Sequence, residues 1–118
     1  KLAGMKYVVF TAKHHSGFCM FDTKTTDFSL AKTPFKRDIT REVVEAFRKH
    51  GLAVGLYFSP DDFHYLYRNN LPMDRDSPQS LPGGNPKLMD FTKRQLKELL
   101  TNYGKIDMVF LDGQTAKH

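Results

Sequence analysis

Three places in the sequence carry polar side chains that can do acid–base or nucleophilic chemistry. They are the pair His14-His15, the tyrosine Tyr57 and the aspartate Asp112. Imidazole and phenol groups hydrogen-bond hydroxyls and carboxylates, and a carboxylate can serve as a nucleophile or as a general acid or base. Each place follows a short apolar run, so the three would meet if those runs are neighbouring strands of one sheet.

Asp112 is the most informative of these residues because of the apolar run that precedes it. Side chains alternate along a strand, so Met108, Phe110 and Asp112 share one face. If Met108 points inward, the carboxylate does too, and an unpaired charge there is costly. The dipeptide Asp112-Gly113 is, however, also a common turn signal. The pattern therefore leaves open both a functional carboxylate and an ordinary turn residue.

The pair His14-His15 lies where the first apolar run ends. Adjacent strand residues point to opposite faces, so the two imidazoles are a poor chelate for one metal ion. Asp61, Asp62 and His64 could add ligands, but Asp61-Asp62 directly after Pro60 is equally typical of a solvated loop. A metal site is therefore not predicted. The imidazoles suit the hydroxyls of a sugar or a carboxylate, and the alternative is one satisfied and one exposed histidine.

Tyr57 and Cys19 each allow a functional and a structural interpretation. Tyr57 shares a strand face with Ala53 and Gly55, whose small size leaves room beside it. Its hydroxyl can therefore contact a ligand or lie in the core. Cys19 is predicted to be a small core residue, because only the nearby histidine pair could act as its base. No phosphate-cradling glycine motif is present.

Hydrophobic patterning predicts three strands, each a short run rich in β-branched and aromatic residues. They span residues 6–13, 53–59 and 106–111. The stretch at residues 60–84 holds four of the six prolines and has no hydrophobic period. It is predicted to be one long surface loop, and loops of that length are usually functional or disordered.

Two helices are predicted, at residues 38–50 and 85–104. Asp38 can cap the first helix, and Asn85-Pro86 is a typical start for the second. Glycine favours the position just after a helix, so Gly51 ends the first. The apolar faces of the two helices would consist of Ile39, Val43, Val44 and Phe47, and of Leu88, Met89, Leu96, Leu99, Leu100 and Tyr103.

The alternation of strands and helices indicates parallel βαβ units with right-handed crossovers, in a sheet that is covered on both faces. Three strands do not close a barrel, and an eight-stranded βα-barrel takes about 250 residues. We therefore expect an α/β fold: part of a (β/α)8, TIM-like barrel, with three parallel strands and two intervening helices. Gly4 is typical of the end of a preceding helix, so residues 1–118 are expected to be a fragment of a single domain.

The composition excludes several classes of function. The 118 residues include 18 Lys and Arg against 13 Asp and Glu, a net charge of +5. The basic residues are scattered along the chain, so no nucleic-acid partner is predicted. One cysteine excludes an internal disulfide. The longest apolar run, residues 7–10, is far too short to span a membrane. The sequence predicts no oligomeric state.

Six ordered blocks of the sequence resemble the catalytic barrel of the α-L-fucosidases, retaining glycoside hydrolases that cleave terminal L-fucose. The blocks are AGMKYVVFTAKHHSGFCMF (3–21), TDFSL (26–30), TPFKRDI (33–39), GLAVGLYFSP (51–60), NPKLMDFTKRQLKELLTNYG (85–104) and IDMVFLDG (106–113). The motif Lys-His-His-x-Gly-Phe in the first block is the most specific. The resemblance implies that residues 1–118 are a fragment of one glycoside hydrolase catalytic barrel.

The resemblance also implies roles for five residues. Asp112 matches the nucleophile of a two-step displacement at the anomeric carbon. His14 and His15 match a pair that hydrogen-bonds fucose hydroxyls. Tyr57 matches a tyrosine that lines the sugar site, and Phe110 matches an aromatic position that packs on the sugar's apolar face and C6 methyl. The implied substrates are fucosylated glycans, glycoproteins or glycolipids, and the implied chemistry needs no cofactor and no metal.

The resemblance also shows which parts of the family's active site the chain lacks or changes. The general acid/base of the family lies beyond His118, so the 118-residue chain alone is expected to be inactive. Ser16 stands where many relatives carry Asp, and the chain has no Trp to stack on a sugar. Family members are typically lysosomal, periplasmic or secreted.

Two alternatives stay open beside the enzyme. One is a catalytically inactive relative that only binds fucose or another carbohydrate, and the other is a βα-barrel hydrolase of another glycoside. The presence of Asp112 favours an enzyme, because an inactive relative would more readily have lost it.

Overall fold

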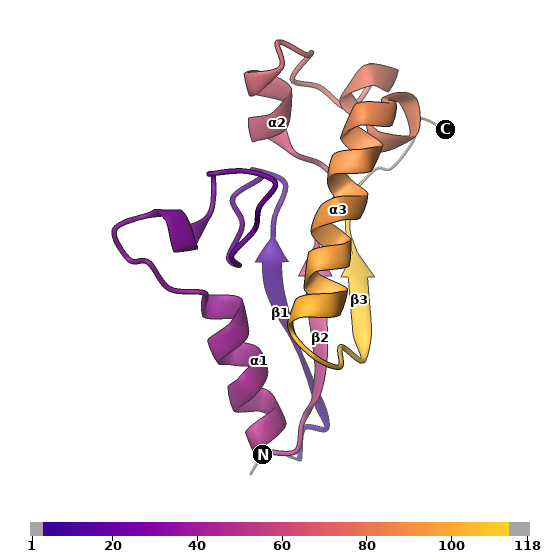
Figure 1. Ribbon diagram of the computed structural model, residues 1–118. Helices are drawn as coiled ribbons and strands as arrows, with labels where there is room; N and C mark the ends of the chain where they lie inside the picture. Colours follow the sequence, from indigo (N-terminus) through magenta and orange to yellow (C-terminus); the bar gives the residue numbers. More distant parts are fainter. Residues whose placement is uncertain (1–3, 114–118) are drawn as a thin grey trace.

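The computed structural model describes residues 4–113, which form three strands and three α-helices (Figure 1). In chain order the elements are β1 (Tyr7–Lys13), α1 (Ile39–Lys49), β2 (Ala53–Phe58), α2 (Phe63–Arg68), α3 (Pro86–Asn102) and β3 (Met108–Leu111). Short 3₁₀ turns lie at Leu30–Lys32, Pro78–Ser80 and Pro82–Gly84. The three predicted strands and two predicted helices are confirmed.

The strands form one parallel sheet in the order β1-β2-β3. The register places Tyr57 of β2 between Thr11 of β1 and Phe110 of β3. The β1–β2 pairing is irregular between Thr11 and Lys13, just before the histidine pair. Because all three strands run the same way, their carboxyl ends meet at one edge of the sheet. This confirms the predicted parallel α/β arrangement.

Helices α1 and α3 cover one face of the sheet, and within residues 4–113 no element covers the other face. Val54, Leu56 and Phe58 of β2 pack in one buried cluster with Val44 of α1 and Leu99 of α3. In Figure 1 both helices accordingly lie on the same side of the sheet. A sheet whose strands follow in chain order keeps its crossover helices on one side, because every right-handed crossover turns the same way.

The opposite face of the sheet is apolar and open. Tyr7, Val9, Met108 and Phe110 are exposed there, Tyr7 by 63%. Gly55 lies on this face between the side chains of Val9 and Met108, 3.0 and 3.2 Å from the position that a Cβ atom would take. The space expected beside Gly55 is therefore filled by its neighbours on the adjoining strands.

Local capping explains where the two long helices begin. The Asp38 carboxylate accepts a hydrogen bond from the Arg41 backbone N–H at 3.0 Å. The Asn85 side chain accepts from the backbone N–H groups of Lys87 and Leu88, and Pro86 follows as the first helical residue. Both predicted starts are confirmed, and both satisfy backbone donors that have no partner within the helix.

The stretch at residues 60–84 is not the long surface loop that its prolines suggest. It contains α2 and two 3₁₀ turns, and Asp61, Asp62 and Leu81 are buried within it. The Asp62 carboxylate caps α2 by accepting from the Tyr65 backbone N–H at 2.8 Å. The interpretation of Asp61-Asp62 as a solvated pair is therefore wrong. A six-residue helix is too short to show a hydrophobic period.

The buried face of α3 differs in part from the predicted one. Leu88, Leu99 and Tyr103 are buried as expected, but Leu100 is 49% exposed. Phe91, Thr92 and Gln95 are buried in the positions between them. The buried face follows steps of three or four residues from Leu88 to Tyr103, whereas Leu100 lies one residue beyond that row. Two residues of this row, Thr92 and Gln95, are polar, so a pattern based on apolar residues alone does not include them.

Cys19 is a core residue, as predicted, and is fully buried. Burial raises the pKa of its thiol to about 12. The thiol therefore stays protonated and unreactive as a nucleophile at neutral pH. Within residues 4–113 no helix is long and apolar enough to cross a membrane.

Candidate active site

A cavity of about 500 Å³ opens at the carboxyl ends of the three strands. Its walls are formed by His14, His15, Tyr57, Ser59, Phe63, Arg75, Asp112 and Gly113. Four of the five residues singled out from the sequence are among them. The fifth, Phe110, lies beside the cavity, because its ring stacks on that of Tyr57.

Tyr57 and Asp112 are joined directly. The Tyr57 hydroxyl donates a hydrogen bond to Oδ2 of Asp112. The backbone N–H of Asp112 donates to the carbonyl of Phe58 at 3.2 Å, which continues the β2–β3 pairing one residue beyond β3. The carboxylate therefore sits at the rim of the sheet, with one oxygen oriented by the phenol.

Three aromatic rings stand in a row across the three strands. The rings of His14 and Tyr57 are stacked with centroids 5.7 Å apart and planes 10° apart. Those of Tyr57 and Phe110 are stacked at 5.8 Å and 18°. Phe110 is 52% exposed on the open face of the sheet. The row follows from the register, which pairs Tyr57 with Phe110 and brings the end of β1 alongside.

Both histidines line the cavity, although neighbouring residues of a strand point to opposite faces. Strand β1 ends at Lys13, and the chain turns at once, because the Gly17 backbone N–H donates to the His14 carbonyl at 3.1 Å. The centroids of the two imidazole rings are 4.1 Å apart, and the ring planes are inclined by 68°. The ring of Phe63 meets His15 edge to face at 5.3 Å. The turn therefore presents two adjacent imidazoles to one cavity.

Arg75 and Phe63 are cavity residues that sequence reasoning missed, because both lie in the stretch with the pattern of a surface loop. The Asp74 carboxylate accepts hydrogen bonds from the backbone N–H groups of Asp76 and Ser77, which shapes the turn that carries Arg75. The guanidinium of Arg75 pairs with Oδ2 of the buried Asp61 at 2.7 Å. The proline content of this stretch gives no signal for either residue.

Asp61 in turn packs closely against the backbone that follows Asp112. It is 3% exposed, and its Oδ2 lies 2.9 Å from the position that a Cβ atom would take at Gly113. Gly113 has φ +128°, a conformation that favours glycine. The negative charge of Asp61 also helps to raise the pKa of Tyr57. The pair Asp61–Arg75 thus lies against the residue that follows Asp112.

The hydrogen bond to Asp112 is the main cause that raises the pKa of Tyr57 above its usual 10.0, with burial and the negative charges of Asp112 and Asp61 adding to it. Arg75 acts in the opposite direction. The phenol therefore stays protonated across the physiological range. Because the folded-state pKa is raised, the bond stabilises the fold below about pH 10, and this contribution is lost as the pH rises through the folded-state pKa.

Replacing Asp112 by asparagine is expected to lower the pKa of Tyr57 toward the ordinary tyrosine value, because the acceptor loses its charge. The titration can be followed by NMR with tyrosines labelled at the ring carbon that bears the hydroxyl, and Tyr57→Phe identifies the signal. An unchanged Tyr57 midpoint in the Asp112→Asn variant would contradict the assigned hydrogen bond.

The cavity therefore combines an oriented carboxylate, two imidazoles and stacked aromatic rings. Imidazoles and a phenol can bind several hydroxyl groups, and exposed ring faces can pack on the apolar face of a small ring. Among residues 4–113 no three His, Cys, Asp or Glu side chains are grouped so that they could hold a metal ion. The arrangement suits a small polyhydroxylated ligand placed against the carboxylate.

The whole chain, residues 1–118, matches the family model described as alpha-L-fucosidase. Alpha-L-fucosidase 1 of Arabidopsis thaliana is 34% identical over 116 residues, which cover 96% of this chain and 20% of the relative. The putative alpha-L-fucosidase 1 of Oryza sativa subsp. japonica is 35% identical over 113 residues, covering 93% of this chain and 19% of the relative. The chain thus spans about a fifth of the length of these curated relatives.

Solved structures show the same similarity. Alpha-L-fucosidase isoenzyme 1 from Paenibacillus thiaminolyticus superposes with a TM-score of 0.80 at 43% identity, over 95% of this chain and 28% of that one. A GH29 alpha-L-fucosidase from Bacteroides thetaiotaomicron, described as a trapped covalent intermediate in complex with 2-fluoro-fucosyl fluoride, superposes with a TM-score of 0.76 at 38% identity. That match covers 92% of this chain and 24% of the other.

Proposed function

The chain belongs to the alpha-L-fucosidase family, and we propose that the protein containing it hydrolyses terminal α-L-fucosyl linkages of glycans, glycoproteins or glycolipids. The observation that carries this proposal is the cavity in which the Asp112 carboxylate stands beside Tyr57 and the pair His14-His15. The proposal concerns the full-length protein, because the chain covers about a fifth of its relatives' length.

In the proposed mechanism Asp112 is the nucleophile of a retaining double displacement. Tyr57 holds Oδ2 by its hydrogen bond, and Oδ1 attacks the anomeric carbon as the bond to the leaving oxygen breaks. A carboxylic acid about 5–5.5 Å away protonates that oxygen. The same group then removes a proton from water, whose oxygen displaces Asp112 and releases fucose. We place this acid/base beyond His118, in line with the family resemblance.

The neighbouring residues of the cavity would bind the sugar. His14 and His15 would present ring nitrogens to fucose hydroxyls, and their close, mutually inclined rings suit two adjacent hydroxyl groups. Phe110 would pack on the apolar face of the sugar and its C6 methyl, since its ring is exposed beside Tyr57. This scheme uses two carboxyl groups and water, and it requires neither a cofactor nor a metal.

The fold supports a (β/α)8 barrel as the setting of this site. In such a barrel the helices form an outer ring and apolar side chains fill the interior. Three features support this proposal: the strand order β1-β2-β3, the position of α1 and α3 on one face, and the open apolar face with Tyr7, Val9 and Met108. We infer that residues 1–118 form part of a single glycoside hydrolase barrel, with the cavity at the carboxyl ends of its strands.

The proposal is tested by assaying the full-length protein on 4-nitrophenyl α-L-fucoside beside the matching galactoside and xyloside. Fucoside is expected to be the best substrate, and proton NMR of the first product should show α-L-fucose, as retention requires. Turnover of another glycoside in preference to fucoside would contradict the proposed substrate. Binding of L-fucose without turnover of any of the three would identify a carbohydrate-binding relative instead.

A further inference from the structure

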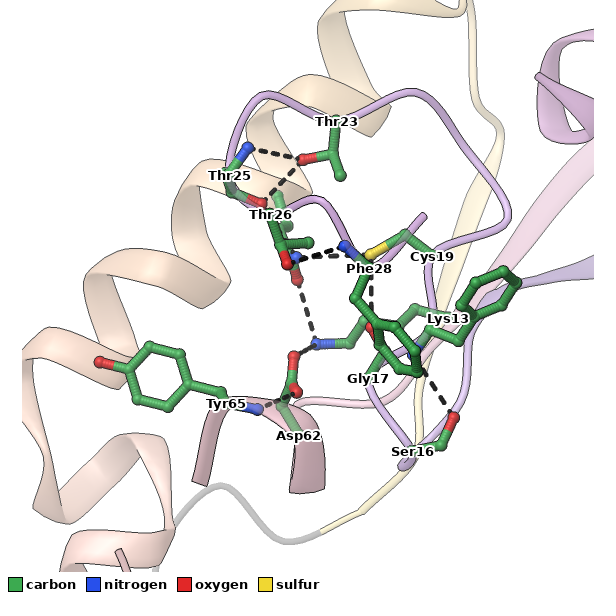
Figure 2. A network of polar contacts seen from close by, with 12 residues as sticks. Lys13, Ser16, Gly17, Cys19, Thr23, Thr25, Thr26, Phe28, Asp62 and Tyr65 are labelled. Atoms are coloured by element: carbon green, nitrogen blue, oxygen red, sulfur yellow. Dashed lines mark hydrogen bonds and ion pairs between the residues drawn. The ribbon is translucent and has the colours of Figure 1, made fainter. Parts of the chain in front are cut away.

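A buried ion pair between Lys13 and Asp62 adjoins the histidine pair, because Lys13 immediately precedes His14. Nζ of Lys13, the last residue of β1, is 3.0 Å from Oδ2 of Asp62, and the two side chains are 0% and 2% exposed (Figure 2). Lysine and aspartate are almost never fully buried without a partner, and breaking a buried pair leaves an uncompensated charge. None of the roles proposed above uses this pair.

The pair joins the two segments that build one wall of the cavity. Lys13 immediately precedes His14, and Asp62 immediately precedes Phe63, whose ring packs on His15. Beyond the pair, the two segments meet through their backbones. The Phe63 N–H donates to the His15 carbonyl at 3.0 Å. The same contact continues one residue further, where the His64 N–H donates to the Ser16 carbonyl at 3.1 Å.

A third element, α3, fixes the position of the ammonium group. Oε1 of Gln95 accepts from Nζ of Lys13 at 3.0 Å, and its Nε2 donates to Oγ1 of Thr25 at 3.0 Å. The ring of Phe58 lies beneath the ammonium, with Nζ 4.5 Å from its centroid. Lys13 is therefore held from three sides, and Asp62 is held by its cap on α2.

We propose that Lys13 and Asp62 are positioning residues for sugar binding, whose ion pair sets the placement of His14-His15 against Phe63. This inference rests on the proposed function of the histidines. The pair acts through its neighbours, because neither of its side chains lines the cavity. Losing the bond frees the turn after β1 to shift relative to α2, and the imidazoles then lose their alignment with the sugar.

The test uses the full-length protein and the variants Lys13→Met, Asp62→Asn and the double variant Lys13→Met/Asp62→Asn. Each single variant leaves one buried charge unpaired and is expected to lower the melting temperature. The double variant has no unpaired charge, and asparagine can still cap α2, so much of the stability should return. The kcat/KM of the double variant for the fucoside is expected to stay about 10- to 100-fold below the wild-type value, as for misplaced binding groups. Its binding of L-fucose should also be weaker.

Tyr103→Phe is the control for the loss of a partly buried polar contact away from the cavity. The Tyr103 hydroxyl donates to Asp38, and neither residue lines the cavity. This variant should lose stability while keeping its kcat/KM when assayed below its melting temperature. If the double variant regains both stability and kcat/KM, the pair is structural only and the proposal is overturned.

An independent readout separates this inference from the proposed function. If the wild-type protein neither turns over nor binds fucose, the proposed function fails. The positions of His14 and His15 can still be followed through the NMR signals of their ring C–H groups, assigned by single His→Gln variants. Shifted ring signals in the double variant, with unchanged signals in Tyr103→Phe, are expected. Unchanged signals in the double variant would overturn the positioning role.

Discussion

Replacing Asp112 by alanine in the full-length protein is expected to reduce kcat/KM for an aryl α-L-fucoside by roughly 10⁴-fold or more, the scale seen when a reacting group is removed. In the proposed mechanism the carboxylate bonds with the anomeric carbon, and the cavity holds it beside Tyr57. Affinity for L-fucose should change only a few-fold, because the proposed sugar contacts of His14 and His15 remain. Initial rates and calorimetric titration measure the two effects.

Azide distinguishes a nucleophile from a structural carboxylate at position 112. The anion fits the space that the Asp112→Ala change leaves, and its attack on an activated fucoside should restore part of the turnover. The product would be β-L-fucosyl azide, because a single displacement inverts the anomeric carbon. The control is Asp90→Asn, since Asp90 is an exposed carboxylate paired with Arg94 on α3. Wild-type turnover by Asp112→Ala without azide would assign the nucleophile elsewhere.

Replacing Gly17 by alanine is expected to destabilise the protein severely, although it adds a single methyl group. Gly17 has φ +91°, and a Cβ atom at this position would lie 2.1 Å from Oδ1 of Asp62. Asp62 cannot retreat, because it pairs with Lys13 and caps α2. The change adds overpacking of about 1–3 kcal/mol or more to the strain of a left-handed backbone, which is about 1–2 kcal/mol.

Gly51→Ala separates these two costs. Gly51 has φ +71°, and no atom lies within 4 Å of the position its Cβ would take. The free energy of unfolding of this control variant should therefore fall only by the backbone strain, about 1–2 kcal/mol. Urea unfolding of the full-length protein measures both variants against the wild type. An equal fall in the free energy of unfolding in Gly17→Ala and Gly51→Ala would mean that Gly17 is not packed against Asp62.

The main elements could be predicted from the sequence because their signals are local. Asp38 and Asn85-Pro86 mark helix starts through contacts within three residues. The site could be predicted in outline from topology, because parallel strands bring their carboxyl ends together. That rule alone places His14, Tyr57 and Asp112 around one cavity, as the structure shows.

The remaining features depend on contacts that no local pattern records. Lys13 stands among the polar residues at the end of β1, where the pattern indicates an open site. It is completely buried instead, because it pairs with Asp62, which lies 49 residues away in the sequence. Arg75 reaches the cavity because the turn at Asp74 and the buried Asp61 place it there. A charged side chain in a proline-rich stretch is ordinarily solvated, so composition argues against the placement of Arg75 and Asp62 alike.

The open apolar face of the sheet couples the site to the folding of the whole molecule. Tyr7, Val9, Met108 and Phe110 gain little from burial while that face meets water, and each would contribute about 1.5–3 kcal/mol once fully enclosed. Phe110 belongs both to this face and to the ring row beside Asp112. If the proposed barrel closes over this face, assembly of the cavity and closure of the hydrophobic interior should be one cooperative event, and thermal inactivation should coincide with global melting.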